Sequence, residues 1–238
     1  MKEQTVFKRY EMKYLITKEQ CEKIKQQMRK YMVGDEYGHS TICNLYFDTP
    51  TYLLIRRSLE KPVYKEKLRL RSYGVADSDS QTFVEIKKKY QSVVYKRRVA
   101  MKESKAMQYL LEKEDTVDSQ ISHEVDYFLE QYPGLQPRVF ISYEREAFYA
   151  KGDSDFRITF DENILWRTHD LSLCKGVYGM PILEENLVLM EIKSVRAIPL
   201  WMTDLLTENR IYQTSFSKYG RAYQNIYLNH KLGGIRYA

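Results

Sequence analysis

Residues 67–71 read KLRLR, a pattern with two different faces. At the two-residue period of a β-strand, Lys67, Arg69 and Arg71 lie on one face and two leucines lie on the other. The leucines suit a core, so the cationic face looks either at water or into a cavity that holds an anion. The other charged strands of the chain bear on this choice.

The composition is that of a globular protein with an excess of positive charge. Of the 238 residues, 43% are hydrophobic and 29% are charged, and 38 Lys and Arg against 32 Asp and Glu give a net charge of +6. This excess favours an anionic partner without identifying it. No apolar run is long enough to span a bilayer, and residues 1–9 lack the apolar core of a signal peptide. We therefore expect a soluble, cytoplasmic protein.

Alternating and helical apolar patterns predict a mixed succession of strands and helices. The predicted strands are residues 7–16, 41–48, 63–73, 82–89, 93–101, 138–150, 155–161 and 187–194. The predicted helices are residues 18–32, 49–59, 103–114, 121–132, 199–206 and 217–229. Residues 163–186 have no regular pattern, so we assign no strand ends there. Without a repeat or a linker, a single domain over residues 1–238 is the simplest interpretation.

Several predicted strands carry a charged face opposite an apolar one. Solvated faces of antiparallel sheets are also charged, so each strand alone fits exposure to water. Together, however, the faces are rich in arginine and in Glu-x-Lys pairs, which suit phosphate recognition and metal bridging. The charged positions are Arg9, Glu11, Lys13, Lys67, Arg69, Arg71, Glu85, Lys87, Arg145, Arg157, Asp161, Glu191 and Lys193.

A closed barrel would turn these faces inward, and it would also remove the exposed sheet edges. A basic interior of this kind would hold a polyanion. The carboxylates within it could bind Mg²⁺ or Mn²⁺, which prefer oxygen ligands and phosphate oxygens. The alternative for each carboxylate is a salt bridge to a neighbouring cation, and for Glu11 the two interpretations are equally open. The four carboxylates are Glu11, Glu85, Asp161 and Glu191.

An ordered set of motifs spans residues 9–222. They are RYEMKYLI (9–16), NLYFDT (44–49), KLRLRSYG (67–74), FVEIKKK (83–89), SYEREAF (142–148), RITFD (157–161), LMEIKS (189–194) and SFSKYGRA (215–222). In this order the motifs resemble the polyphosphate polymerase (VTC) domain of the CYTH, or triphosphate tunnel metalloenzyme, superfamily. Each motif alone is weak, but the ordered set is specific and covers nearly the whole chain.

The resemblance implies an α+β fold, a closed antiparallel β-barrel that forms a triphosphate tunnel with helices packed on the outside. It implies Glu191 as a metal ligand and Tyr143 and Ser217 as supporting phosphate contacts, and Arg9 and Lys67 extend the substrate-binding set. Serine and lysine at the start of the last predicted helix suit an anion independently of the family. The phosphate ligands that the resemblance implies are Lys13, Arg69, Arg71, Lys87, Arg145, Arg157, Lys193 and Lys218.

Two positions depart from the family patterns. Hydrolases and cyclases of the superfamily typically begin with Glu-x-Glu-x-Lys, whereas Arg9 stands first here. One carboxylate is therefore lost from the group that would bind metals or activate water, which favours a polymerase over a triphosphatase. The polymerases tend to have a lysine where this chain has Ser215, which bears on the exit of polyphosphate and on product length.

The sequence thus predicts an enzyme that transfers the terminal phosphate of ATP, or of another nucleoside triphosphate, to inorganic polyphosphate with Mn²⁺ or Mg²⁺. An anionic phosphate acceptor needs no general base, which fits a chain without a Ser-His-Asp or Cys-His set. The alternatives are a triphosphatase and a non-catalytic module that binds polyphosphate or another polyanion. We expect no nucleic-acid partner, because no aromatic stacking platform accompanies the arginines. A membrane-protein partner is left open.

Overall fold

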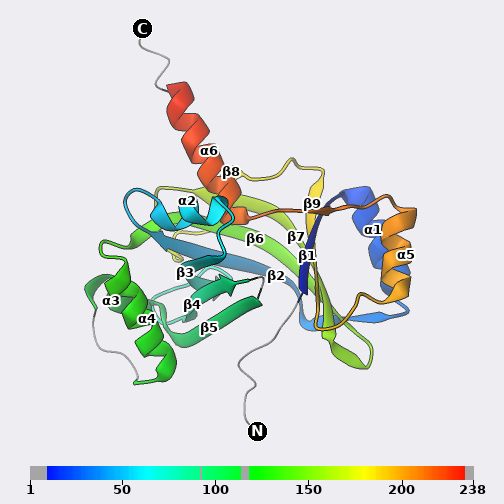
Figure 1. Ribbon diagram of the computed structural model, residues 1–238, viewed down its shortest axis with the longest axis horizontal. Helices are drawn as coiled ribbons and strands as arrows, with labels where there is room; N and C mark the ends of the chain where they lie inside the picture. Colours follow the sequence, from blue (N-terminus) through cyan, green and yellow to red (C-terminus); the bar gives the residue numbers. More distant parts are fainter. Residues whose placement is uncertain (1–9, 92, 114–117, 234–238) are drawn as a thin grey trace. The chain divides into compact units, whose positions relative to one another are not determined.

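The computed structural model describes residues 10–91, 93–113 and 118–233 (Figure 1). Its strands are β1 (Tyr10–Thr17), β2 (Met32–Asp48), β3 (Tyr64–Tyr73), β4 (Gln81–Tyr90), β5 (Val93–Lys102), β6 (Gln136–Ala150), β7 (Asp153–Arg167), β8 (Met180–Pro181), β9 (Leu187–Ser194) and β10 (Gln213–Thr214). Its helices are α1 (Lys18–Met28), α2 (Leu53–Leu59), α3 (Glu103–Glu112), α4 (Gln120–Gln131), α5 (Leu200–Glu208) and α6 (Lys218–Gly233).

The strands form one antiparallel sheet with the order β10-β1-β9-β7-β6-β2-β3-β4-β5, and β8 pairs with β7. The predicted α+β class and antiparallel sheet are therefore confirmed. Among the described residues, no hydrogen-bonded pairing joins β10 to β5, so backbone hydrogen bonds do not close the sheet into the predicted barrel. No helix in the described part of the chain is both long and apolar enough to cross a membrane.

The chain divides into two compact units. Unit 1 takes its described residues from Met1–Thr41, Tyr143–Ile164 and Leu183–Phe216, and unit 2 takes them from Ile42–Ser142, Leu165–Ile182 and Ser217–Ala238. The long strands β2, β6 and β7 contribute residues to both units.

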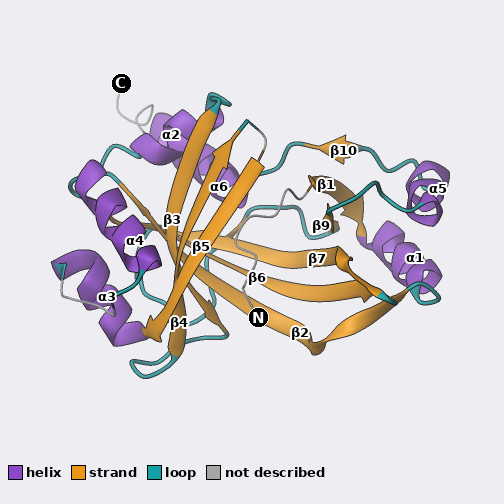
Figure 2. Ribbon diagram, turned by 60° about the horizontal axis from the view of Figure 1, so that its bottom comes forward, coloured by secondary structure: helices purple, strands orange, loops and turns teal. Residues whose placement is uncertain are grey.

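Unit 1 covers the apolar face of β1, β9 and β7 with α1 and α5, which lie side by side (Figures 1 and 2). Helix α1 begins with a capping box, in which the Thr17 hydroxyl accepts from the Gln20 N–H at 3.1 Å and the Gln20 side chain accepts from the Thr17 N–H at 3.0 Å. The core contains Ile16, Ile24, Met28, Ile158, Phe160, Met190, Ile192 and Met202, all nearly inaccessible to solvent.

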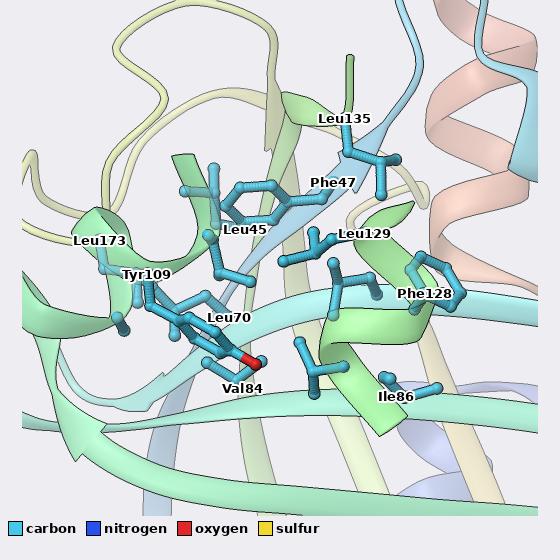
Figure 3. Close-up of a cluster of buried hydrophobic side chains, with 14 of the residues drawn as sticks. Leu45, Phe47, Leu70, Val84, Ile86, Tyr109, Phe128, Leu129, Leu135 and Leu173 are labelled. Atoms are coloured by element: carbon cyan, nitrogen blue, oxygen red, sulfur yellow. The ribbon is translucent and has the colours of Figure 1, made fainter. Parts of the chain in front are cut away.

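Unit 2 has its own core between α3 and α4 and the apolar face of β3, β4 and β5 (Figures 2 and 3). The leucines of the KLRLR stretch, Leu68 and Leu70, are both 0% exposed in this core. The sequence assigned them to the buried face, and this is confirmed. Figure 3 shows the packing of Leu45, Phe47, Leu70, Val84, Ile86, Tyr109, Phe128 and Leu129.

Several element boundaries differ from the sequence-based prediction. Helix α1 ends at Met28 rather than Met32, because Met32 already begins β2 and buries its side chain in the core of unit 1. Strand β7 continues to Arg167 instead of ending at Asp161. In the sequence, the polar run 161–163 and the apolar run 164–166 break the alternation of apolar and polar residues, which conceals this part of the strand. Residues 7–9 of the first predicted strand, which include Arg9, and residue 114 of a predicted helix lie outside the described residues.

Candidate functional site: two cationic strand faces

The polar face of unit 2 consists of rows of side chains that cross β3, β4 and β5. In one row Arg69 lies opposite Glu85, and Glu85 lies opposite Arg98. In the next row Lys67 lies opposite Lys87, and Lys87 lies opposite Lys96. Like charges directly opposite each other destabilise a sheet, so this row favours an anionic ligand. We call this surface the β3–β5 face; it comprises Lys67, Arg69, Arg71, Glu85, Lys87, Lys96 and Arg98.

Glu85 is the carboxylate at the centre of the β3–β5 face, and it is 1% exposed. Its Oε2 accepts from Arg69 Nε at 2.8 Å and Nη2 at 2.6 Å, and its Oε1 lies 2.6 Å from Lys96 Nζ. Burial opposes ionisation of this carboxyl, but Arg69, Arg71 and Lys96 together hold its pKa well below the usual range. Glu85 is therefore ionised and forms ion pairs with the surrounding cations.

Lys96 is a site residue that the sequence analysis missed. Its Nζ pairs with Glu85, while burial, assisted by Arg71 and Arg69, lowers the pKa of Lys96 to about 8 despite this partner. Its side chain as a whole is 41% exposed. The sequence KRR at residues 96–98 places cations on both faces of β5, and only the pairing with β4 shows which of them face Glu85.

Polar partners fix the two arginines of the KLRLR stretch. Arg71 Nε donates to Asn44 Oδ1 at 2.9 Å, and Asn44 Nδ2 in turn donates to the Ile141 carbonyl at 3.1 Å. Arg69 Nη1 donates to the Tyr46 hydroxyl at 3.2 Å. Both guanidinium groups therefore have a set orientation before any ligand binds, which reduces the ordering that binding requires.

The beginning of α6 contributes to the same unit. Lys67 Nζ donates to Ser217 Oγ at 3.2 Å, and this oxygen also accepts from the Gly220 N–H at 3.1 Å, as a helix cap does. Lys218 is the first residue of α6. A helix N-terminus favours an anion, and Lys67, Ser217 and Lys218 add polar side chains to it. The structure thus brings these three predicted residues to one end of α6.

Unit 1 carries a second polar face, in which rows of side chains cross β1, β9 and β7. Glu11 lies opposite Lys193, which lies opposite Arg157. In the next row Lys13 lies opposite Glu191, which lies opposite Thr159. We call this surface the β1–β9–β7 face; it comprises Glu11, Lys13, Arg157, Thr159, Glu191 and Lys193.

The cations of the β1–β9–β7 face are held by neighbours in unit 1. Lys13 Nζ donates to the Phe216 carbonyl at 2.9 Å, and Arg157 Nη2 lies 3.6 Å from Asp35 Oδ2. The pKa of Lys193 falls to about 8 because burial, together with Arg145 and Arg157, outweighs the opposing effects of Glu11 and Asp161. The charged form of Lys193 is therefore less stable here than in water, and a bound anion would stabilise it.

Unit 1 also contains a buried ion pair between Arg145 of β6 and Asp161 of β7. The Arg145 guanidinium donates to both carboxylate oxygens of Asp161, at 2.6 and 2.7 Å, and lies 5.0 Å from the centre of the Tyr143 ring. The Asp161 side chain is fully buried. The pair is bidentate, which is the strong and geometrically specific form of this interaction.

Glu191 is the carboxylate best suited to a divalent ion. It is 5% exposed, and its Oε1 accepts no hydrogen bond from the described residues, although Lys193 Nζ lies 3.3 Å away. Within the described ranges, no cluster of three or more His, Cys, Asp or Glu residues could enclose a metal by itself. The residues therefore fit Mg²⁺ or Mn²⁺ held by one or two carboxylates with phosphate and water, a common arrangement for these ions.

All the predicted site residues except Arg9, which lies outside the described part of the chain, lie in these two groups. Those in unit 1 are Glu11, Lys13, Tyr143, Arg145, Arg157, Asp161, Glu191 and Lys193. Those in unit 2 are Lys67, Arg69, Arg71, Glu85, Lys87, Ser217 and Lys218. Their roles in binding and catalysis remain predictions.

Comparison with solved structures gives the class of fold. A protein of Bacillus halodurans described as a candidate adenylate cyclase is similar with a TM-score of 0.54 and 14% identity, over 87% of this chain and 92% of its own. A candidate adenylate cyclase of Vibrio parahaemolyticus gives 0.53 and 12%, over 92% and 99%. At this identity the likeness concerns the fold alone.

The family follows from the sequence model. The VTC domain model matches residues 8–227, and the chain therefore belongs to the VTC domain family. The family resemblance predicted from the ordered motifs is confirmed. No curated protein matches the chain.

Proposed function

We propose that this protein is a polyphosphate polymerase, which transfers the terminal phosphate of ATP to a growing inorganic polyphosphate chain. The observation that carries the proposal is the crowding of cations on two strand faces, where the pKa of Lys96 and that of Lys193 both fall to about 8. Crowded and partly buried cations bind a multiply charged phosphate chain well, because each anion relieves their repulsion. Membership of the VTC domain family supports the same activity.

The cations of both faces would bind and orient the phosphates. Arg69, held by Glu85 and Tyr46, and Arg145, held by Asp161, present fixed guanidinium groups to phosphate oxygens. Phosphoryl transfer through a loose transition state depends on such alignment and on positive charge around the transferred group. Lys13, Lys87, Arg157, Lys193 and Lys218 extend this set.

A divalent ion, Mn²⁺ or Mg²⁺, is part of the proposal, with Glu191 as its ligand on the protein. When bound, the ion supplies positive charge that offsets the charge developing on the leaving nucleoside diphosphate. We assign Asp161 and Glu85 to holding Arg145 and Arg69, because their oxygens accept short hydrogen bonds from these guanidinium groups. Glu11, opposite Lys193 in the sheet, is a second candidate ligand.

The proposal assigns phosphate binding to each of the two cationic faces. It therefore predicts that Lys13→Met in unit 1 and Lys87→Met in unit 2 each weaken tripolyphosphate binding, and that the double variant loses more than either. Polyphosphate is the proposed second ligand, and a cytoplasmic location with a membrane-protein partner that receives the product remains part of the hypothesis.

The test is to incubate purified protein with ATP and Mn²⁺ and to follow ADP, free phosphate and polymer together. Equal amounts of ADP and polymer-bound phosphate are expected. Free phosphate without polymer would instead indicate a triphosphatase, which Arg9 in place of a glutamate disfavours. Tight polyphosphate binding without any turnover would indicate a non-catalytic binding module.

A further inference from the structure

A buried hydroxyl group lies next to Glu191 in the sheet. Thr159 is 0% exposed, and its Cα is paired with that of Glu191 between β7 and β9. Thr159 Oγ1 accepts or donates no hydrogen bond within the described part of the chain, and the same holds for Glu191 Oε1. Two buried polar atoms without hydrogen bonds therefore belong to directly opposite residues on one face of the sheet.

The hydroxyl has no evident role in folding. The neighbours of Thr159 along the strand, Ile158 and Phe160, point to the opposite side and fill the core of unit 1. Valine has nearly the same shape as threonine and would carry no polar atom that needs a partner. Because a buried hydroxyl without a partner costs stability, its presence here indicates a partner beyond the described residues, such as a bound water.

The surroundings suit one bound water molecule. Directly opposite side chains in an antiparallel sheet have Cβ atoms about 4.5–5.5 Å apart, so the side chains of Thr159 and Glu191 are neighbours, and a water can bridge neighbouring polar groups that do not bond directly. A buried water needs two to four polar partners. Thr159 Oγ1 and Glu191 Oε1 supply two, and Lys193 Nζ, 3.3 Å from the same carboxylate oxygen, supplies a third.

We propose that Thr159 is a positioning residue for the divalent ion: its hydroxyl and Glu191 Oε1 hold one water between them, and this water is a ligand of the ion. The inference rests on the proposed function, since it places the ion at Glu191. Mg²⁺ and Mn²⁺ bound through one carboxylate keep several water ligands. Protein groups that hold the ligands of a metal typically change its affinity by 10–100-fold.

The test measures Mn²⁺ binding alone, by electron paramagnetic resonance of the free ion, without nucleotide or phosphate. Thr159→Val removes the hydroxyl and keeps the volume, and it should weaken Mn²⁺ binding about tenfold. Thr159→Ser keeps the hydroxyl and should bind Mn²⁺ within about twofold of the wild type. Glu191→Gln shows how much Mn²⁺ the protein binds when the proposed metal ligand is absent. Urea unfolding without metal should show the Thr159→Val protein to be about as stable as the wild type, because the hydroxyl forms no hydrogen bond to any described protein group.

The alternative outcomes are distinct. If Thr159→Val binds Mn²⁺ as the wild type does while Glu191→Gln does not, the role of Thr159 is wrong and the metal-dependent function stands. If Thr159→Val unfolds at lower urea concentration than the wild type, the hydroxyl has a structural partner and the inference is again overturned. If the wild type binds no more Mn²⁺ than Glu191→Gln, both the inference and the metal assignment fail.

Discussion

Arg145 and Asp161 form a closed pair, with Arg145 Nε 2.6 Å from Asp161 Oδ1 and Nη2 2.7 Å from Oδ2. The two residues stand on adjacent strands, β6 and β7, and the Asp161 side chain is fully buried. A guanidinium group held in this way has one orientation, which suits the recognition of a phosphate. We therefore propose that Asp161 positions Arg145, and that Glu191 rather than Asp161 is the ligand of the divalent ion.

Replacement of Asp161 by asparagine should lower the free energy of unfolding by about 3 kcal/mol, because it leaves the Arg145 charge without its buried partner. Urea denaturation at pH 7 measures the loss. Glu162→Gln is the matched control: it lies next in the same strand, its side chain is 27% exposed, and its ion pair with Lys25 is 4.0 Å long. The control should lose less than about 1 kcal/mol. Equal stability of the two variants would contradict the role given to Asp161.

The Glu85 carboxylate should make stability depend on pH. Burial opposes its ionisation, but Arg69, Arg71 and Lys96 hold its pKa well below the ordinary value of 4.5. A lowered carboxyl pKa stabilises the fold fully above the ordinary value, and this contribution declines as the pH falls below it. At pH 7, Glu85→Gln should therefore cost about 3 kcal/mol of unfolding free energy.

The difference between the wild type and Glu85→Gln should shrink when unfolding is measured at pH 3 instead of pH 7, since the wild type loses the ionic contribution of Glu85 as the pH falls. Tripolyphosphate at pH 7 should restore part of the stability of Glu85→Gln, because it supplies the missing negative charge to the arginines. A difference that stays constant from pH 7 to pH 3 would show that Glu85 acts through packing rather than charge.

The pattern of the strands was predictable where apolar and charged residues alternate without interruption. Strand β9 was predicted as residues 187–194, and the structure has it as Leu187–Ser194. Other strands have no clear pattern in the sequence, for reasons that the structure shows. The first half of β2 is largely exposed and contains Gly34 and Gly38, so no apolar face marks it. The short strand β10 has only two residues, and its pairing with Lys13 and Tyr14 is not encoded in any local pattern.

The candidate site was predictable only in part. Alternation alone placed Arg69, Arg71 and Lys193 on a polar strand face, because a buried apolar residue precedes each of them. Lys96 could not be chosen over Arg97, since it required the pairing of β4 with β5 to show that Arg97 lies opposite Ile86 on the other face. Ser217 and Lys218 were predicted from the motif resemblance. They stand at the start of a helix, so the alternation of residues along strands could not identify them.

The lysines with lowered pKa values should make anion binding sensitive to pH. Lys96 and Lys193 both have pKa values of about 8, against an ordinary value of 10.5. A bound anion favours the protonated lysine, so tripolyphosphate affinity should fall as the pH rises through 8, by about tenfold for each charged hydrogen bond that is lost. In the free protein the sign is opposite: stability should increase between pH 8 and 10.5, because the unfolded chain binds more protons there.

Isothermal titration calorimetry with tripolyphosphate at pH 7 and pH 9 measures this effect. Lys96→Arg with Lys193→Arg is the control, because arginine stays charged at both values and the ligand itself titrates identically in both experiments. The double variant should show a much smaller loss of affinity than the wild type. An equal loss in both proteins would assign the pH dependence to the ligand and refute the role of these lysines.

Tyr219 should stabilise the segment next to the β3–β5 face. Its hydroxyl donates to Asp48 Oδ2 at 2.9 Å, and Asp48 also accepts from the backbone N–H groups of Leu54 and Ile55 at the start of α2. Tyr219→Phe removes this bond and keeps the ring, which is stacked on Tyr46 at 4.6 Å. We expect a loss of about 1–2 kcal/mol in urea denaturation. Unchanged stability would mean that Asp48 holds α2 without Tyr219.

The central claim, that Glu191 supports phosphoryl transfer from ATP to polyphosphate, is tested most directly by the fate of the γ-phosphate. ATP labelled at this position is incubated with Mn²⁺ and the wild type, Glu191→Gln or the control Glu162→Gln, and the labelled products are separated by length. The account predicts labelled polymer from the wild type and from Glu162→Gln, and none from a folded Glu191→Gln protein. Polymer from Glu191→Gln at the wild-type rate, or free phosphate as the sole labelled product of the wild type, would contradict it.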